Sequence, residues 1–339
     1  MRLATITLIT LVALSLASVT ASQETGFDIT RLTDGISVFV DAQEGADQLA
    51  INTNDGIVVI NSMWSNATAS RFRSAIAEHF GSNKFIYNIN SVDRLDVFGG
   101  NETYADTTIV GHANFTRKFS QDYVDSERAR LIEMWRGKEK HAREADQGAL
   151  WINTCKRRAD ELEQSYSLRL PEITYNDRLI IRLDGTTLEL ISFGKAGYDG
   201  MTLIVVPEEH VAIVPGFILH SQHLAPHPQP RFVELDVPRW IDLLEEILND
   251  NDRIEKLIVD NGSIWTKERA RTHLRYVKTL WETVRSAKAE GKSLEQVQEL
   301  CSMDGKFAFV KKNQVYLDHG DEWVRPQHLV HVKAFYMQE

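Results

Sequence analysis

Apolar residues near the start of the chain alternate with polar ones, the pattern of half-buried β-strands. The four alternating stretches are 27–32, 36–40, 48–53 and 56–61. Asn54-Asp55-Gly56 separates the last two and is a hairpin turn signal, so we expect an antiparallel opening to a sheet. The apolar spacing becomes helical over 67–80 and ends at Gly81, and a strand-like run follows at 84–88. Strand, helix and strand in this order predict a parallel crossover.

Charged residues of both signs dominate the segment 117–170, which follows a short predicted strand at 107–112. Its apolar positions form a narrow stripe at helical spacing. This pattern favours a pair of helices packed over the edge of the sheet. A lid, or an arm that docks a partner, would carry the same pattern, and the sequence leaves that alternative open.

Strand-like runs resume in the second half of the chain, at 179–183, 187–193, 201–207 and 211–216. Turns separate them at short intervals, which predicts a second sheet built as a meander. Amphipathic helices are expected at 240–248 and 267–290, with a strand at 256–259 between them. Ser293 and Gln296 form a capping box that begins a further helix.

Composition is that of a globular protein with a sizeable core. The chain has 339 residues, of which 43% are hydrophobic and 25% are charged. Acidic residues outnumber basic residues by 48 to 38, which gives a formal net charge of -10. Sequence-independent binding of nucleic acid needs a basic surface, so we expect no nucleic-acid partner.

The segment 1–21 has the features of a secretory signal peptide. Arg2 supplies the positive start, residues 3–17 are apolar, and Val19-Thr20-Ala21 is a small-residue cleavage site. The apolar run is shorter than the ~20 residues that a membrane span needs. We therefore expect a mature chain, 22–339, that is secreted or periplasmic and not held in a membrane.

Two cysteines, Cys155 and Cys301, fall in separate predicted helical regions. An oxidising compartment permits a disulfide between them. Pairing needs spatial adjacency, which the sequence does not establish, so the bridge stays open. Two cysteines with no nearby histidine pattern are too few for a structural zinc site.

The most specific pattern runs from Tyr87 to Asn101 and reads Y-N-I-N-S-V-D-R-L-D-V-F-G-G-N. A strand-like run leads into a polar loop with Asp93, Arg94 and Asp96, and the loop closes on Gly-Gly-Asn. This stretch resembles the metal-binding loop of the metallo-β-lactamase superfamily, N-T-H-x-H-x-D-H-x-x-G-N, which also follows a strand.

Other stretches resemble the superfamily in the same order along the chain. They are 57–61, 174–190, 207–216 and 328–336, which resemble the early strand, the start of the second half, a later strand and the closing helix. The resemblance implies an α/β fold, a four-layer αββα sandwich over 22–339. It implies a helical insertion at 117–170 and a C-terminal helical region and tail at 267–339.

The metal ligands of the superfamily are not kept. Aligned on the resemblance, the seven ligand positions fall on Val92, Arg94, Asp96, Val97, Gly197, Phe217 and Asn261. Asp96 alone keeps a matching ligand type. A catalytic zinc needs about three protein ligands and an open position for water. Without the ion, water keeps a pKa near ~15.7 instead of ~7, and the hydroxide nucleophile is lost. We therefore expect no metal and no cofactor.

Two hypotheses concern the vacated loop. In the first, the guanidinium of Arg94 supplies the positive charge that zinc once gave and pairs with Asp96 beside Asp93. In the second, Asp96 caps the following helix and Arg94 points to solvent.

Further residues are expected at the same cleft if the resemblance holds. Tyr198, Asp199 and Asn261 offer hydrogen bonds to a polar small molecule or, alternatively, to the backbone of their own loops. His220 and His223 stand with His227 in a proline-rich stretch. They form a displaced metal site or are surface histidines, and their spacing matches no zinc pattern. His112, at the end of a strand, is expected to be a core or rim histidine.

Three functions compete. The first is a secreted pseudoenzyme of the metallo-β-lactamase fold that lacks zinc hydrolase activity and binds an unidentified small molecule or protein partner in the former active-site cleft. The second is a divergent hydrolase with a rebuilt site, in which Asp93, Asp96, His220 or His223 act as acid and base or hold a displaced metal. The third is a scaffold that docks a partner through 117–170. The lost ligand positions favour the first or the third.

Overall fold

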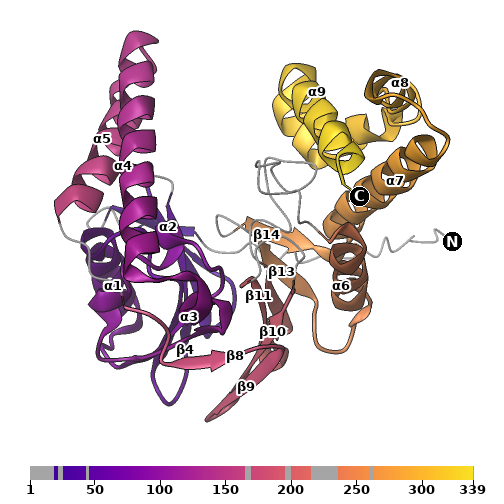
Figure 1. Ribbon diagram of the computed structural model, residues 1–339. Helices are drawn as coiled ribbons and strands as arrows, with labels where there is room; N and C mark the ends of the chain where they lie inside the picture. Colours follow the sequence, from indigo (N-terminus) through magenta and orange to yellow (C-terminus); the bar gives the residue numbers. More distant parts are fainter. Residues whose placement is uncertain are drawn as a thin grey trace, which may run out of the picture.

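The computed structural model describes residues 19–21, 26–42, 46–164, 169–194, 200–214, 236–259 and 263–338 (Figure 1). The strands of these ranges form two sheets, one with eight strands in the order β1 to β8 and one with six in the order β14-β13-β12-β11-β10-β9. None of the described helices is both long and apolar enough to span a bilayer.

The first sheet begins antiparallel and becomes parallel. Its strands are β1 (Val19–Ala21), β2 (Phe27–Arg31), β3 (Ile36–Asp41), β4 (Asp47–Asn52), β5 (Ile57–Ile60), β6 (Phe85–Asn90), β7 (Thr108–His112) and β8 (Ile173–Tyr175). The pairs from β1 to β5 are antiparallel, and those from β5 to β8 are parallel. The predicted hairpins are confirmed. The strand β1 lies in the predicted signal segment and pairs with β2.

Helix α1 (Asn66–Phe80) makes the predicted crossover from β5 to β6. Ser65 caps its start, because the Ser65 side chain accepts a hydrogen bond from the Thr68 amide. Gly81 ends it in the left-handed conformation, with φ of 63°, which glycine adopts without steric cost. Both ends of this helix are therefore determined by local sequence.

The second sheet is the predicted meander extended by two more strands. Its strands are β9 (Arg178–Leu183), β10 (Thr186–Ser192), β11 (Thr202–Val206), β12 (Val211–Val214), β13 (Lys256–Val259) and β14 (Ser263–Thr266), and the short helix η2 (Pro207–Glu209) joins β11 to β12. β9 to β12 pair antiparallel, whereas β13 runs parallel to β12. The parallel step follows from helix α6 (Val237–Asn249), which lies between the two strands in the chain.

Three apolar cores separate four layers. The core between the sheets joins Val38 and Ile60 of the first sheet to Leu190 and Ile204 of the second. A second core packs α1 on the outer face of the first sheet. A third packs α6 and α7 (Lys267–Ala289) on the outer face of the second sheet. Figure 1 shows α1 on one side of the sheets and α6 and α7 on the other. The αββα sandwich expected from the sequence is confirmed.

Two helices at the carboxyl end of the chain complete the outer layer over α7. They are α8 (Leu294–Leu300) and α9 (Gln314–Tyr336), joined through η4 (Ala308–Lys312). The predicted capping box of Ser293 and Gln296 is present at the start of α8. Within α9, Gly320 has φ of 75° and ψ of -175°, so two helical pieces meet at a kink there.

The charged segment after β7 forms a helical hairpin. After α3 (Asn114–Lys118), the chain makes α4 (Gln121–Glu144) and α5 (Ala149–Gln164). An apolar cluster packs the base of the hairpin on α2 (Leu95–Phe98) and α3, with Phe98, Phe115, Leu131 and Leu162 among its members. The rest of the pair stands out from the sheets (Figure 1). The predicted helical pair is thus present, and it contacts the body through its base.

Candidate functional site

The loop that resembles the metal-binding loop lies at the carboxyl end of β6, where parallel strands of such folds place their chemistry. It continues into α2 and then into η1 (Asn101–Tyr104). Gly99 and Gly100 approach the segment after β5 closely. A Cβ added to Gly100 would lie 2.1 Å from the Ser62 carbonyl oxygen, and one added to Gly99 would lie 2.4 Å from that of Trp64. Only glycine fits at these two positions, which explains the Gly-Gly pair of the pattern.

Asp93 is the buried charge of this loop, with 1% of its surface exposed. The ammonium of Lys118, the last residue of α3, lies 3.0 Å from the Asp93 carboxylate oxygen Oδ2 and 3.0 Å from the Asp93 carbonyl oxygen. Gly200, at the start of the chain that leads into β11, lies on the other side, because an added Cβ there would be 2.6 Å from the Cβ of Asp93. An ion pair therefore sits where the loop, α3 and the second half of the chain meet.

Lys118 was not among the residues expected at the cleft. It ends a short helix of mixed composition, and no local motif connects it to Asp93, 25 residues earlier in the chain. A buried carboxylate requires a partner, so the sequence indicates that some cation is needed at Asp93. The identity of that cation follows from the packing of α3.

Arg94 stands at the N-cap position of α2 with an extended backbone, φ -127° and ψ 134°, and it makes no side-chain cap. Asp96 lies inside α2, so it is not the N-cap of that helix. The prediction that Asp96 caps this helix is therefore wrong. The proposed pairing of Arg94 with Asp96 stays a prediction, because the side chain of Asp96 lies outside the described part of the structure.

Asn101, the last residue of the pattern, is the centre of a buried amide network. Its Oδ1 accepts hydrogen bonds from Ser62 Oγ at 2.7 Å, Asn88 Nδ2 at 2.9 Å and Asn90 Nδ2 at 3.1 Å. Its Nδ2 donates to Asn90 Oδ1 and to the Arg169 carbonyl, both at 2.8 Å. The network ties β6 to the ends of the loop, so the terminal asparagine is structural.

Asn61 and Ser91 join the loop to both sheets. Asn61 follows β5 with φ of 66°, a left-handed conformation that asparagine tolerates better than most residues. Its Oδ1 accepts the Ser91 amide at 2.9 Å, and the Ser91 carbonyl accepts the amide of Thr202 in β11 at 2.8 Å. Asn61 therefore positions the backbone of the loop.

His112 is a core histidine, as expected. It is 6% exposed, and its Nδ1 accepts a hydrogen bond from the Asn114 amide at 3.2 Å. The proton of the neutral ring is then on Nε2, which donates to the Asn176 carbonyl at 2.7 Å. Nδ1 thus holds the turn between β7 and α3, and Nε2 ties it to the turn between β8 and β9.

The positions of the lost zinc ligands do not fit the ion. Val92 is 4% exposed and belongs to the core under α6 and α7, and Val97 packs against the same core. Aliphatic side chains provide no donor atom, and the adjacent cation is the Lys118 ammonium. Within the described ranges, no group of three or more histidine, cysteine, aspartate or glutamate residues is arranged to hold a metal.

Five other predicted site residues, Tyr198, Asp199, His220, His223 and Asn261, lie outside the described residues. The same holds for Gly197 and Phe217, two of the altered ligand positions. Of the predicted site, the structure therefore describes the loop after β6.

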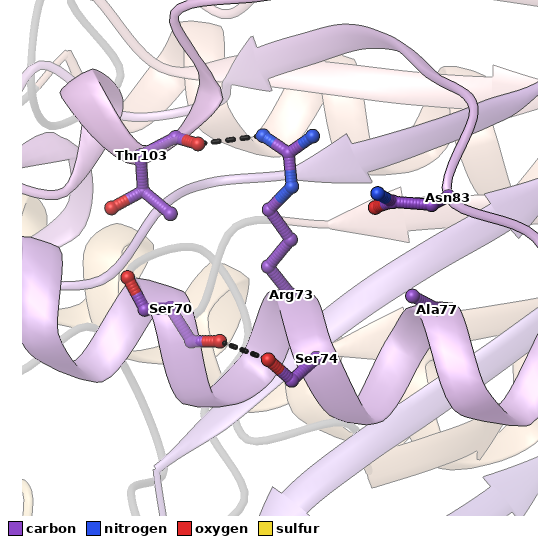
Figure 2. A pocket seen from close by; sticks show the side chains of 6 residues that line it. All are labelled: Ser70, Arg73, Ser74, Ala77, Asn83 and Thr103. Carbon is purple, nitrogen blue, oxygen red and sulfur yellow. Dashed lines mark hydrogen bonds between the residues drawn. The ribbon is translucent and has the colours of Figure 1, made fainter.

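A surface hollow lies beside α1, and its lining includes none of the residues predicted for the cleft. Figure 2 shows its lining: Ser70, Arg73, Ser74, Ala77, Asn83 and Thr103. The Arg73 guanidinium donates to the Thr103 carbonyl at 2.6 Å and to both carboxylate oxygens of Asp106 at 2.6 Å. The hydrogen bond that Arg73 donates to Asp106 is the main reason why the pKa of Arg73 is raised. The cation that lines the hollow is thus engaged in a structural ion pair.

Solved structures share this architecture. The stereoselective inverting sec-alkylsulfatase Pisa1 from Pseudomonas sp. matches with a TM-score of 0.64 and 16% identity, over 91% of this chain and 49% of its own. A metallo-β-lactamase from Hirschia baltica matches with a TM-score of 0.50 and 11% identity, over 74% of this chain and 97% of its own. The present chain spans about half the length of the alkylsulfatase. No family model and no curated protein matches the sequence.

The chain therefore has the metallo-β-lactamase fold, with a helical hairpin inserted after β7. It departs from the metal-binding pattern of that fold at the loop after β6. Identities of this size define the fold and carry no activity from one protein to another.

Proposed function

We propose that this chain is a binding protein built on the metallo-β-lactamase fold, without zinc hydrolase activity. It takes a small molecule or a protein partner in the cleft at the carboxyl ends of β5, β6 and β7. The observation that carries the proposal concerns two of the zinc-ligand positions: Val92 is buried in an apolar core, and Val97 packs, partly buried, against the same core.

The charge of the loop supports this view. A zinc ion would add two positive charges beside Lys118, whose ammonium already pairs with the buried Asp93 carboxylate at 3.0 Å. Like charges close together in a buried site are costly, so the loop favours a state in which the protein supplies its own cation. With no activated water, the chemistry left to the cleft is recognition by hydrogen bonds and charge.

Export is part of the proposal. The segment 1–21 carries the signal pattern, and its removal would leave β2 as the edge of the first sheet. A secreted or periplasmic chain would meet soluble ligands outside the cytoplasm. Fractionation of cells that express the full chain tests this part, and recovery of an uncleaved chain in the cytoplasm would contradict it.

Metal content tests the central claim. The purified chain is incubated with excess zinc, passed over a desalting column and measured for bound metal, with the Hirschia baltica metallo-β-lactamase as the positive control. We expect well below one zinc per chain. One or more tightly bound zinc ions would overturn the proposal. Loss of that zinc in the His220→Ala and His223→Ala variants, but not in His319→Ala, would establish the divergent hydrolase with a displaced site.

The binding claim needs its own test. Thermal-shift screening of polar small molecules compares the parent chain with Arg94→Ala, because Arg94 is half-buried at the loop. A ligand of the cleft should stabilise the parent chain more than the variant. Equal stabilisation of both by every compound that binds would place binding elsewhere and contradict the proposal.

A further inference from the structure

Four residues form a buried polar cluster where α7, the end of α8 and α9 meet. The ring of Tyr276 is fully buried, and His328 and His331 are each 1% exposed. The Tyr276 hydroxyl oxygen lies 2.9 Å from Nδ1 of His328 and 3.2 Å from Nδ1 of His331. Nε2 of His328 lies 2.6 Å from the carbonyl oxygen of Cys301, the C-cap residue of α8.

The chemistry of these groups fixes the direction of each hydrogen bond. A carbonyl oxygen accepts only, so Nε2 of His328 carries a proton and donates to Cys301. In the neutral ring, Nδ1 of His328 then has a lone pair and accepts the hydroxyl proton of Tyr276. That hydroxyl has no second proton, so its oxygen accepts from Nδ1 of His331. The cluster is a directed chain from His331 to Tyr276, to His328 and to the backbone of α8.

We propose that this chain of hydrogen bonds is a proton-sensitive latch that holds α8 and the second half of α9 on α7 at neutral pH and loosens in mild acid. The latch joins three elements through one hydroxyl group. It acts on the piece of α9 that follows the kink at Gly320, and both histidines lie on this piece.

Protonation of His328 breaks the chain at its centre. The imidazolium has a proton on both nitrogens, so Nδ1 no longer accepts the proton of the Tyr276 hydroxyl. That proton has then lost its acceptor in the cluster. A positive charge also stands in a buried surrounding, where the ring centroids of His328 and Phe307 are 5.1 Å apart. Both effects favour the opened state.

The charge of Arg325 acts in the same direction as burial. Burial is the largest cause of the lowered pKa of His328, the hydrogen bond to Cys301 opposes it, and the Arg325 cation lowers it further. Arg325, on α9, pairs with Asp304 and Asp321. Lys306 follows α8 and is the charge that acts on the Cys301 thiol, whose pKa burial raises to about 11. No carboxylate is hydrogen-bonded to His328 among the contacts of the described chain.

The sign of the pH dependence follows from the lowered pKa. The unfolded state binds a proton at His328 more tightly than the folded state. The stabilisation is therefore complete above the ordinary histidine pKa of ~6.5 and is lost as pH falls below it towards the folded value. For one proton, opening increases by up to about tenfold per pH unit in this window.

Other contacts keep α9 attached when the latch opens. The Tyr336 hydroxyl donates to the Lys292 carbonyl at 3.0 Å, and the Lys288 ammonium donates to the Gln338 carbonyl at 2.6 Å. The opening is therefore local, and amide hydrogen exchange is the measurement that resolves it.

The test compares exchange in α9 at pH 7.5 and 5.5, corrected for the intrinsic rate, in the full chain and in two variants. In the parent chain we expect several-fold faster opening of 321–336 at pH 5.5, with no change in α1. His328→Gln keeps a donor and an acceptor but does not titrate, so its α9 should exchange alike at both pH values. His319→Gln, an exposed histidine of the same helix, should behave as the parent. The latch would be overturned if exchange in α9 of the parent chain did not depend on pH, or if exchange in the His328→Gln variant kept the full pH dependence.

A measurement without substitution covers the case in which His328→Gln does not fold. Nitrogen-15 chemical shifts of the histidine rings in the parent chain report which nitrogen is protonated. At pH 7.5 we expect the proton of His328 on Nε2 and that of His331 on Nδ1. A proton on Nδ1 of His328 at this pH would contradict the directed chain and with it the latch.

Discussion

Glu161 of α5 attaches the helical hairpin to the sandwich through four polar contacts, and its removal gives a sharp prediction. The carboxylate oxygen Oε2 accepts hydrogen bonds from Trp64 Nε1 at 3.0 Å, Ser65 Oγ at 2.5 Å and Thr68 Oγ1 at 2.7 Å. The other oxygen, Oε1, pairs with the Arg71 guanidinium at 3.1 Å. Glu161 is 9% exposed, so little water replaces these partners.

The magnitude follows from the kind of contact. Each hydrogen bond to a charged group is worth about 1.5–3 kcal/mol, but four bonds on one carboxylate do not add. Removal of one member of a buried charged pair costs about 3–5 kcal/mol, because the remaining groups lose their partner in a dry site. Arg71 is 35% exposed and retains water, so we expect Glu161→Ala to lower the free energy of unfolding by about 3–4 kcal/mol.

The assay is urea and thermal unfolding, with exchange in α4 and α5 as the local readout. A loss of this size lowers the melting temperature by roughly 4–6 °C in a chain of this length. The matched control is Glu163→Ala, on the same helix, whose carboxylate is 44% exposed and pairs with Arg136. Exposed pairs contribute about 0–1 kcal/mol, so the control should change little. Equal effects of the two substitutions would refute the reasoning.

The pH dependence of the same group has a definite sign. Burial alone would raise the pKa of Glu161, but the hydrogen bonds from Ser65, Thr68 and Arg71 outweigh it, and the pKa is lowered. Its contribution is therefore present above the ordinary glutamate pKa of about 4.3 and is lost as pH falls below that value. The difference in stability between the parent and Glu161→Ala should narrow below about pH 4.

Three further predictions concern buried polar groups. Lys118→Met removes the ammonium from the buried Asp93 carboxylate and should lower the free energy of unfolding in urea by roughly 2–3 kcal/mol. Asp93→Asn in the same chain should restore much of that stability, and additive losses in the double variant would contradict the ion pair. Asn101→Ala removes five hydrogen bonds and should cost about 3 kcal/mol or more, and a loss below about 1 kcal/mol would rule out the network. Cys155 and Cys301 are free thiols buried in different cores. With no reductant added, a thiol reagent should react with neither cysteine in the native chain and with both in denaturant.

Local signals in the sequence were sufficient to define the starts of two helices and the end of one. The helix α1 begins after the Ser65 cap and ends at Gly81, and α8 begins with the predicted capping box. These signals act over three or four residues, so they operate before tertiary contacts form. Strand ends were less well defined, and the run expected at 84–88 extends to Asn90, because sheet pairing carries it further.

The candidate site was predictable only in part. The resemblance of the loop located Asp93, Arg94 and Asp96 at the end of β6, and the structure places them there. It did not indicate Lys118, the partner of Asp93, because α3 is positioned by the packing of its own aromatic residues on α2. The pairing of Cys155 with Cys301 was open in the sequence, and the separate cores of the two residues decide against it.

The sequence by itself determined the alternation of strands and helices, the order of the two sheets and the loss of the metal-ligand residue types, because these depend on periodicity, capping and residue identity. Tertiary structure decided which distant charges meet. Asp93 pairs with Lys118, 25 residues away in the chain, and Glu161 accepts a hydrogen bond from Ser65, 96 residues away. A buried carboxylate requires a partner wherever it lies, but which partner it obtains depends on the packing of whole elements, and no local pattern encodes that choice.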